Sequence, residues 1–474
     1  MSEKVLIMGL SKSGVAAARF LNKKGYDVYI TESKSLADIR EEFKPQVQEL
    51  KDLGIKIECG YHSDEFLSGA SFAVTSPGIP PKSEIFRRLN EKGIKIISEI
   101  ELAYLNTKTP FIAITGTNGK TTTTALVSHI LSKDFSAPVC GNIGVPPTSL
   151  IEEEHDFLVC EISSYQAQMT EKFKAKIACW TNFTPDHIDW HGGLENYFAA
   201  KAKIFLPPQE PEYAILNAKD SKLKEFASKC KNVIFFDNDA DIDNAVIARN
   251  VSDEAIQKQD IDCHENQRFS HNDVQSGAYI KDGAIFYNNE AIITLADCPL
   301  VGHHNYQNIM CGIIIAKLVG MKNEDIREQI MSFRAPEHRL EKVRTMDGIT
   351  FFNDSKATNP EASIVAIDSF NNQDVALILG GRDKNTDLTE MCHSINKHIK
   401  TVLLIGEATE RFEENLKKNG FSNIIKERTM EDAIDKAISL KPDVVLLSPA
   451  CASFDMFNSY EHRGEVFKQY VLSK

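Results

Sequence analysis

Residues 111–124, FIAITGTNGKTTTT, have the residue types and spacing to do chemistry on a phosphate. An apolar run at 111–114 leads into a glycine turn that ends in Gly119, Lys120 and Thr121, and a helical pattern follows. A strand that delivers such a turn into a helix N-terminus directs backbone N–H groups and the helix dipole at one point, which suits a phosphate. Lys120 could reach the β- and γ-phosphates, and the Thr121 hydroxyl could hold Mg²⁺. We therefore predict an ATP site; a turn without function is the alternative.

Acidic and histidine side chains follow two further apolar runs. The run at 157–160 ends at Glu161, which we expect to ligate Mg²⁺, because the carboxyl ends of parallel strands face the ligand crevice. A solvent-facing acid is the alternative for Glu161. The run at 177–181 leads into Asp186, His187, Asp189 and His191, a crowding that indicates a metal or phosphate site.

The elements expected to position these residues alternate between strand and helix. Residues 4–8 read as a buried strand, and Gly9, Ser11 and Gly14 then give a degenerate dinucleotide fingerprint, with Glu32 after the next strand. NAD could bind there, although a helix N-terminus accepts any diphosphate. Further strands are predicted at 350–352, 375–379, 401–405 and 444–447, with helices at 360–369, 387–398, 407–418, 430–439 and 461–472.

This alternation predicts an α/β protein of three domains. We assign residues 1–97 to a Rossmann-like N-terminal domain, 98–335 to a central ATPase-type domain with a parallel sheet, and 336–474 to a doubly wound, Rossmann-like C-terminal domain. A chain of 474 residues is too long for one ordinary hydrophobic core, which agrees with several domains.

Composition excludes several classes of protein. The net charge of −13 argues against a nucleic-acid surface, so any affinity for phosphate must be local. The ten cysteines include no C-x-x-C pair, which is typical of reduced cysteine in the cytoplasm. No apolar run reaches the roughly 18 residues of a membrane span. We expect a soluble cytoplasmic protein, without nucleic-acid or membrane partners, that acts as a monomer.

A set of motifs in a fixed order resembles the Mur ligases, and among them the members that add D-glutamate. The motifs are TGTNGKTTT, GNIG, EISSYQ, NFTPDHIDWH, YFAAK, GHHNYQN, EHRLE, NDSKATNP and SPACASFDMF, and the resemblance extends from residue 4 to about 470. It implies a reaction in which ATP phosphorylates the terminal carboxylate of UDP-MurNAc-L-Ala. The amine of D-glutamate then attacks the acyl phosphate, and phosphate leaves.

The resemblance also implies roles for individual residues. It assigns ATP to Gly116, Thr117, Asn118, Gly119, Lys120, Thr121, Thr122, Asn305, Asn308, Arg339, Asp354 and Lys356. Thr121 and Glu161 would serve a first Mg²⁺, and His187 a second, supported by Lys201 as a carbamate. Helical periodicity alone says nothing about Lys201. For the other substrates the resemblance implies Lys12 and Ser13 near the uracil, Asn142 at the diphosphate, and Thr358, Lys384, Ser453 and Tyr460 for D-glutamate.

Three other readings remain open. A sibling ligase with another amino-acid acceptor, or a folylpolyglutamate synthase, would share the mechanism; the DSKATNP motif at 354–360 favours D-glutamate, because siblings typically carry a histidine there. A regulatory nucleotide-binding protein without turnover would need only the glycine turn. An NAD dehydrogenase depends on Gly9, Ser11 and Gly14 alone.

Overall fold

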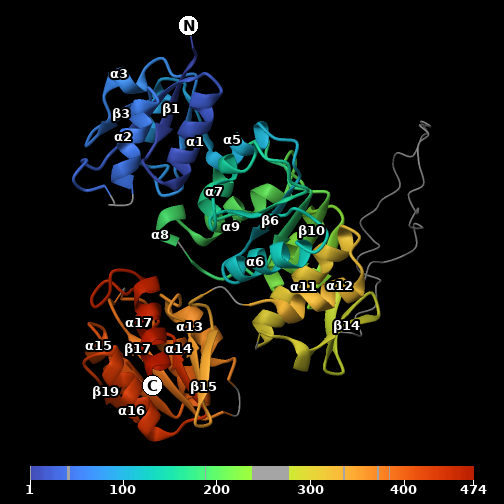
Figure 1. Ribbon diagram of the computed structural model, residues 1–474, viewed down its shortest axis with the longest axis vertical. Coiled ribbons are helices and arrows are strands. Elements are labelled where there is room, and N and C mark those ends of the chain that lie inside the picture. The colour runs from blue at the N-terminus through green and yellow to red at the C-terminus, as the bar shows by residue number, and fades with distance from the viewer. Residues whose placement is uncertain are drawn as a thin grey trace. The chain divides into compact units, whose positions relative to one another are not determined.

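The computed structural model describes residues 2–39, 43–186, 188–237, 277–300, 302–334, 337–370, 373–383 and 385–474 (Figure 1). The chain forms two compact units. The first unit comprises Met1–Asp297 with Gln307–Met331, and the second comprises Cys298–Tyr306 with Ser332–Lys474. Two sheets lie in the first unit and one in the second, which confirms the predicted α/β class with parallel sheets.

The N-terminal sheet has five described strands, all parallel, in the order β3-β2-β1-β4-β5. Along β1, Val5 and Ile7 pack in one apolar cluster while Leu6 and Met8 pack in another, because successive side chains point to opposite faces. Both faces are therefore covered, as in other parallel sheets. The elements are β1 (Lys4–Met8), α1 (Lys12–Lys23), β2 (Asp27–Glu32), α2 (Lys44–Asp52), β3 (Lys56–Cys59), α3 (Asp64–Leu67), β4 (Phe72–Thr75), α4 (Glu84–Glu91), β5 (Lys95–Ser98) and α5 (Glu99–Leu105).

The central sheet has nine described strands in the order β14-β13-β12-β11-β10-β9-β6-β8-β7. Strands β6 to β12 pair in parallel, and β13 and β14 add an antiparallel edge. The strands are β6 (Phe111–Thr115), β7 (Val139–Gly141), β8 (Leu158–Glu161), β9 (Ile177–Trp180), β10 (Tyr213–Asn217), β11 (Val233–Phe236), β12 (Ala278–Lys281), β13 (Ala284–Tyr287) and β14 (Glu290–Thr294). The helices are α6 (Lys120–Leu131), α7 (Ser164–Gln168), α8 (Ile188–His191), α9 (Leu194–Ala202), α10 (Ser221–Phe226), α11 (His303–Leu318) and α12 (Asn323–Ser332), with short 3-10 turns η2 (Pro147–Ser149), η3 (Lys203–Phe205), η4 (Ala227–Lys229) and η6 (Leu295–Asp297).

Helix α5 ties the two sheets of the first unit together. The buried carboxylate of Glu99 accepts hydrogen bonds from the Thr148 backbone N–H at 2.7 Å and from its hydroxyl at 2.5 Å. Glu101 accepts from three successive backbone N–H groups, those of residues 171–173. Burial raises the pKa of Glu99 to about 7, although the bonds from Thr148 oppose the shift. This joint therefore contains a carboxyl group that titrates near neutral pH.

The sheet of the second unit has six described strands in the order β15-β16-β20-β17-β18-β19. They are β15 (Glu341–Met346), β16 (Ile349–Asn353), β17 (Val375–Gly380), β18 (Thr401–Ile405), β19 (Ile424–Lys426) and β20 (Val444–Leu447). The helices are α13 (Pro360–Ile367), α14 (Thr389–His398), α15 (Thr409–Lys418), α16 (Met430–Leu440) and α17 (Tyr460–Ser473). The four predicted strands and five predicted helices of this region are confirmed. The prediction missed β15 and β19, which lie at the edges of the sheet, where half-exposed strands lack a continuous apolar run.

Two further predictions concern the chain as a whole. Among the described helices, none is both long and apolar enough to cross a membrane. None of the nine cysteines within the described ranges forms a disulfide, as predicted for reduced thiols, and Cys263 lies outside those ranges.

Candidate functional site

The predicted glycine turn connects β6 to α6, and its backbone needs glycine at two positions. Gly116 has φ +148°, and a Cβ there would lie 1.9 Å from the Thr181 hydroxyl oxygen. Gly119, the N-cap of α6, has φ +83°, and a Cβ there would lie 2.7 Å from Asn308 Oδ1. Gly119 has no side chain, so the N-cap residue of α6 makes no side-chain bond to the first turn. The N-cap residue therefore does not compete with an anion for the first backbone N–H groups of α6.

Side chains from the end of the neighbouring strand β9 hold the turn in place. Asn182 Oδ1 accepts a hydrogen bond from the Asn118 backbone N–H at 2.8 Å. Asn182 Nδ2 and the Thr181 hydroxyl both donate to the Asn118 carbonyl oxygen, at 3.0 and 2.6 Å. On the opposite side of the turn, the Thr117 hydroxyl lies 3.2 Å from the Tyr197 hydroxyl. The turn is thus fixed by side chains from β9 and α9, as a preorganised binding site needs to be.

The side-chain nitrogens of two lysines meet at the same backbone oxygen. Lys120 Nζ donates to the carbonyl oxygens of Gly116 and Thr117 at 3.0 and 2.8 Å. Lys201, on α9, is 1% exposed and donates to the Gly116 oxygen at 2.7 Å. Burial holds the pKa of Lys201 well below its usual range, and the charge of Lys120 adds to that effect, while Asp186 and Glu161 oppose it. This shift makes the neutral amine of Lys201 easier to form than that of a solvent-exposed lysine, and the neutral amine is the nucleophilic form.

Glu161 ends β8 beside this turn and is 1% exposed. Its Oε1 accepts a hydrogen bond from Asn142 Nδ2 at 2.8 Å. Its Oε2 is buried and has no hydrogen-bond partner among the described residues. A buried carboxylate oxygen without a partner is costly and needs a cation or a donor. This oxygen, with the buried Thr121 hydroxyl on α6, fits Mg²⁺, which prefers oxygen ligands and takes one or two carboxylates together with substrate phosphates.

The acidic and histidine-rich segment after β9 is only partly described. His187 lies outside the described residues, and no group of three or more His, Cys, Asp or Glu side chains within the described ranges could hold a metal. His191 Nε2 lies 2.9 Å from the Ser164 hydroxyl, and its ring stacks on Tyr165 with centroids 5.5 Å apart. His191 is therefore engaged in packing between α7 and α8. Asp186, which sequence analysis placed only in a general cluster, acts electrostatically on Lys201.

The glycine turn of the N-terminal sheet differs from that of the central sheet. The Ser11 hydroxyl caps α1 by accepting from the Gly14 backbone N–H at 3.3 Å, and it lies 2.7 Å from the Ser76 hydroxyl. Glu32 Oε2 accepts from the Leu10 backbone N–H at 2.8 Å. A serine and a carboxylate of this chain thus take up donors that a diphosphate would need. At the same helix N-terminus, the Ser13 hydroxyl lies 3.0 Å from that of Ser11, and Lys12 is exposed.

In the second unit, several predicted residues gather at the ends of β16 and β20. Asp354 is buried; its Oδ2 accepts from the Ser448 hydroxyl at 2.8 Å and its Oδ1 from the Leu340 backbone N–H at 3.2 Å. Burial raises the pKa of Asp354 to about 7, and these hydrogen bonds and the charges of two arginines, including Arg339, oppose the shift. Lys356 Nζ lies 5.4 Å from the centre of the Tyr460 ring.

Arg463 joins the two loops of this site, and no sequence pattern predicted it. Arg463 is 1% exposed and donates from Nε and Nη2 to the hydroxyl and carbonyl oxygens of Ser355, at 2.9 and 2.8 Å. Its Nη1 donates to the Cys451 carbonyl oxygen at 3.1 Å. Desolvation lowers the pKa of Arg463 to about 10. The pattern of α17 carries no signal for this role, because an arginine in an amphipathic helix usually faces solvent.

The residues predicted to bind D-glutamate lie partly within the described ranges. Lys384 lies outside them. The hydroxyl oxygen of Ser453 is buried without a hydrogen-bond partner among the described residues, as is Oδ1 of Asp455 two residues further on. Thr358 and Tyr460 are half-buried. Ser453 thus has hydrogen-bonding capacity that a polar ligand could use.

The two asparagines predicted to hold adenine belong to different compact units. Asn308, in the first unit, accepts from the Thr123 hydroxyl at 2.9 Å through its Oδ1. This bond, and the closeness of Asn308 to Gly119, place it beside the first turn of α6. Asn305 belongs to the second unit, where its backbone N–H donates to the Gly302 oxygen. Both side chains are buried. Their role toward adenine remains a prediction.

Comparison with known proteins assigns each part of the chain a relative. Residues 3–98 match the family model "Mur ligase MurD-like, N-terminal domain", residues 114–316 "Mur ligase middle domain", and residues 338–451 "Mur ligase, glutamate ligase domain". The UDP-N-acetylmuramoylalanine–D-glutamate ligase of Koribacter versatilis is 37% identical over 99% of this chain and 97% of its own. That of Shouchella clausii is 38% identical over 99% and 97%. Among solved structures, UDP-N-acetylmuramate-alanine ligase from Thermotoga maritima shares the fold, with a TM-score of 0.58 at 18% identity over 99% of this chain and 100% of that one.

Proposed function

The chain belongs to the Mur ligase family, and on that premise we propose that it joins D-glutamate to UDP-N-acetylmuramoyl-L-alanine with consumption of ATP, a step of peptidoglycan precursor synthesis. The observation that carries this proposal is the similarity to D-glutamate ligases over nearly the whole chain, at 35–38% identity. The glycine N-cap of α6 supports the proposal, because it makes no side-chain bond that would compete with a phosphate for the helix N-terminus.

The chemistry divides into two transfers. The terminal carboxylate of the sugar nucleotide attacks the γ-phosphorus of ATP, and ADP leaves. The amine of D-glutamate then attacks the resulting acyl phosphate, loses a proton, and expels inorganic phosphate as the amide forms. Charge spreads over the phosphoryl oxygens in the first transfer, so positioned cations and N–H donors are the main catalytic groups. Lys120 and the first turn of α6 carry that role in our proposal.

Mg²⁺ would neutralise phosphate charge and orient the reacting oxygens. The unpartnered Oε2 of Glu161 and the Thr121 hydroxyl are the described groups that fit a first ion. We propose His187 as a ligand of a second ion, as the resemblance implies. Asn142, which donates to Glu161, has a polar environment compatible with its proposed contact to the diphosphate of the sugar nucleotide.

Lys201 is proposed to act as a carbamate. Its neutral amine would attack the carbon of CO₂ and release one proton to solvent, so that an uncharged buried amine becomes a carboxylate-like anion able to support Mg²⁺. Two observations support this. The pKa of Lys201 is well below its usual range because of burial, and Lys201 has no ion-pair partner among the described carboxylates. Only the neutral amine can add CO₂.

The remaining assignments keep the roles that the resemblance implies. We propose Thr358, Lys384, Ser453 and Tyr460 for D-glutamate, Lys12 and Ser13 for the uracil, and Asn305, Asn308, Arg339, Asp354 and Lys356 for ATP. The buried and unpartnered hydroxyl of Ser453 supports the first of these assignments. We also propose that the enzyme works in the cytoplasm as a monomer, which light scattering at assay concentration would test.

The test of the function is a matrix of substrates. Phosphate release from ATP is measured with UDP-MurNAc-L-Ala and, in turn, D-glutamate, L-glutamate, L-alanine, a diamino acid and D-Ala-D-Ala. We expect release that requires both the sugar nucleotide and D-glutamate. Release with another acceptor would assign the chain to a sibling activity, and no release from folded protein with Mg²⁺ would favour a binding protein.

A further inference from the structure

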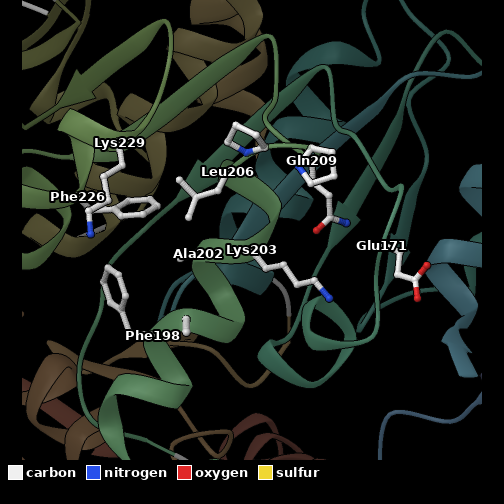
Figure 2. Close-up of a pocket in the computed structure, with 11 residues that line it drawn as sticks. Glu171, Phe198, Ala202, Lys203, Leu206, Gln209, Phe226 and Lys229 are labelled. Carbon is white, nitrogen blue, oxygen red and sulfur yellow. The ribbon is translucent and has the colours of Figure 1, made fainter.

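A pocket of about 520 Å³ lies beside α9 in the first unit, but its two lysines do not meet at one point (Figure 2). Figure 2 shows Lys229 next to Phe226 at one end of the pocket, away from Lys203. The second unit is different. There a single buried cation, Arg463, bonds to two loops of the proposed site at once.

Three loops come together at Arg463, and each of them follows the carboxyl end of a strand. Nε and Nη2 of Arg463 donate to Ser355, after β16, and Nη1 donates to the Cys451 carbonyl oxygen, after β20. The third loop follows β17, and a Cβ atom at Gly381 in that loop would lie 3.1 Å from Nη1. Strands β16, β20 and β17 are neighbours in the sheet and pair in parallel. Because ligands of open α/β sheets bind outside the carboxyl ends of the strands, Arg463 lies at the edge where a ligand is expected.

Arg463 is a buried cation whose three hydrogen-bond acceptors are uncharged. It is 1% exposed, and the acceptors are one hydroxyl and two carbonyl oxygens. The carboxyl groups of Asp455 and Asp354 act on it electrostatically, without a described hydrogen bond to it. A buried charge without a directly bonded counter-charge is costly, so stability alone does not explain an arginine here. The guanidinium group presents its N–H donors in a rigid planar fork, which fixes the spacing of the oxygens that it bonds.

The loop after β20 has a backbone conformation that its sequence does not favour. Ala450 has φ +58°, in the left-handed region, which costs roughly 1–2 kcal/mol for a residue other than glycine. Carbonyl oxygens on both sides of Ala450 accept hydrogen bonds: that of Pro449 from the backbone N–H at the end of β17, and that of Cys451 from Arg463. Such strain persists only where the surroundings impose it, and it is frequent at ligand sites. Arg463 is one of the groups that impose it.

We propose that Arg463 is a positioning residue for D-glutamate, a role that rests on the function proposed above. The loop after β16 (354–359) contains Thr358, and the loop after β20 (448–455) contains Ser453; both residues are proposed to bind D-glutamate. By bonding to both loops, Arg463 sets the spacing between these two side chains. Arg463 is itself buried and acts through the loop backbones. Its loss should therefore weaken the binding of D-glutamate more than that of the sugar nucleotide.

Steady-state kinetics with saturating ATP test this role. Arg463→Lys keeps the charge but loses the planar fork, and Arg463→Met loses both. We expect KM for D-glutamate to rise by about tenfold in Arg463→Lys and by about a hundredfold in Arg463→Met. KM for UDP-MurNAc-L-Ala should stay within about twofold of wild type, because the residues proposed for it lie in the first unit. A purely structural loss would lower the amount of active enzyme and leave both KM values unchanged, and that result would overturn the proposal.

Arg344 provides the matched control. It lies in β15 and also connects the sheet to α17, donating at 3.3 Å to the carbonyl oxygens of Val471 and Leu472. These bonds are made near the end of α17, and none of the proposed site residues takes part in them. Arg344→Met should therefore lower the free energy of unfolding without raising KM for D-glutamate. An equal rise of that KM in Arg344→Met and Arg463→Met would show a general effect of α17 and contradict the proposal.

Hydrogen exchange tests the role of Arg463 without turnover and needs only the conservative variant. Amides in residues 354–359 and 448–455 should exchange at least about tenfold faster in Arg463→Lys than in wild type, whereas those of β18 should not change. Wild-type exchange rates in both loops would overturn the proposal. Faster exchange in these loops, together with a wild-type enzyme that does not use D-glutamate, would reject the proposed function but not the connection between the loops. The two failures are therefore distinguishable.

Discussion

The first compact unit contains two strand–glycine turn–helix segments that share a layout and differ in what fills the turn. The turn before α1 uses this chain's own Ser11 and Glu32 to satisfy its backbone N–H groups. The turn before α6 has a glycine N-cap without a side-chain bond and is flanked by two lysines. A glycine turn at a helix N-terminus is therefore not sufficient for a phosphate site; the N–H groups must also be left for the ligand.

We expect the largest effect on activity at Lys201, because the α1 turn has no corresponding lysine. Lys201→Ala and Lys201→Arg should both lower the rate of phosphate release by about a thousandfold, because neither side chain can form a carbamate that supports Mg²⁺. Lys224→Ala, at an exposed lysine on α10, is the control and should leave the rate unchanged. An arginine variant that retained wild-type activity would exclude the carbamate role.

The first residues of the two helices offer a matched pair. Lys120→Ala should lower kcat by about 10²–10³-fold, because it removes a cation from the proposed phosphate site. Lys12→Ala, at the corresponding position of α1, should leave kcat unchanged and raise only KM for the sugar nucleotide. Steady-state rates with each substrate varied would measure both. Equal losses of kcat in the two variants would contradict the proposed difference in function between the turns.

Glu99 lies on α5, the helix that joins the two sheets of the first unit, and we expect it to make the free energy of unfolding depend on pH. The pKa of Glu99 is raised to about 7 in the folded protein, so its contribution to stability is fully present below about pH 4.5 and is lost as pH rises through 7. Relative to wild type, Glu99→Gln should gain up to about 3 kcal/mol of unfolding free energy between pH 5 and pH 8. Denaturant unfolding at both pH values measures this. Glu91→Gln, at an exposed acid of α4, is the control and should show no such gain.

Substitution of the acids beside the two turns should affect the Mg²⁺ dependence of activity differently. Glu161→Gln should raise the Mg²⁺ concentration for half-maximal activity by about tenfold or more, because an amide oxygen replaces the charged and unpartnered Oε2. Glu32→Gln, beside the α1 turn, should leave the Mg²⁺ dependence unchanged. An identical Mg²⁺ response in wild type and Glu161→Gln would remove Glu161 from the metal site.

The smallest expected effect is the loss of the α1 cap. Ser11→Ala should cost about 1 kcal/mol of unfolding free energy, the usual value of a helix N-cap, and leave KM for ATP unchanged. Thermal unfolding and ATP titration would measure the two quantities. A raised KM for ATP would mean that the two turns are not functionally separate.

The parts of the fold that were predicted correctly are encoded by short, local sequence patterns. Continuous apolar runs such as those of β6 and β17 are buried on both faces, and a glycine turn with a following helix is encoded within some fifteen residues. The edge strands β15 and β19 were missed, because strands exposed on one side give a weaker pattern. The class of the fold was therefore readable from local pattern alone.

The parts of the site that sequence could not predict depend on contacts between distant residues. Lys201 reaches the Gly116 oxygen across 85 positions of the chain, and Arg463 reaches Ser355 across 108. Both residues lie in helices whose charged side chains normally face solvent, so periodicity assigned neither a role. The resemblance supplied Lys201, and nothing in the sequence pattern supplied Arg463. Burial of a charged side chain is a tertiary property, which only the folded chain reveals.

In the proposed mechanism, ATP activates the terminal carboxylate as an acyl phosphate before D-glutamate attacks. UDP-MurNAc-L-Ala labelled with ¹⁸O in that carboxylate tests this step, with the released phosphate followed by ³¹P NMR. An acyl phosphate transfers one carboxylate oxygen to phosphate, so we predict one ¹⁸O atom in each phosphate released. Phosphate without ¹⁸O, with the label retained in the product or lost to water, would contradict the mechanism.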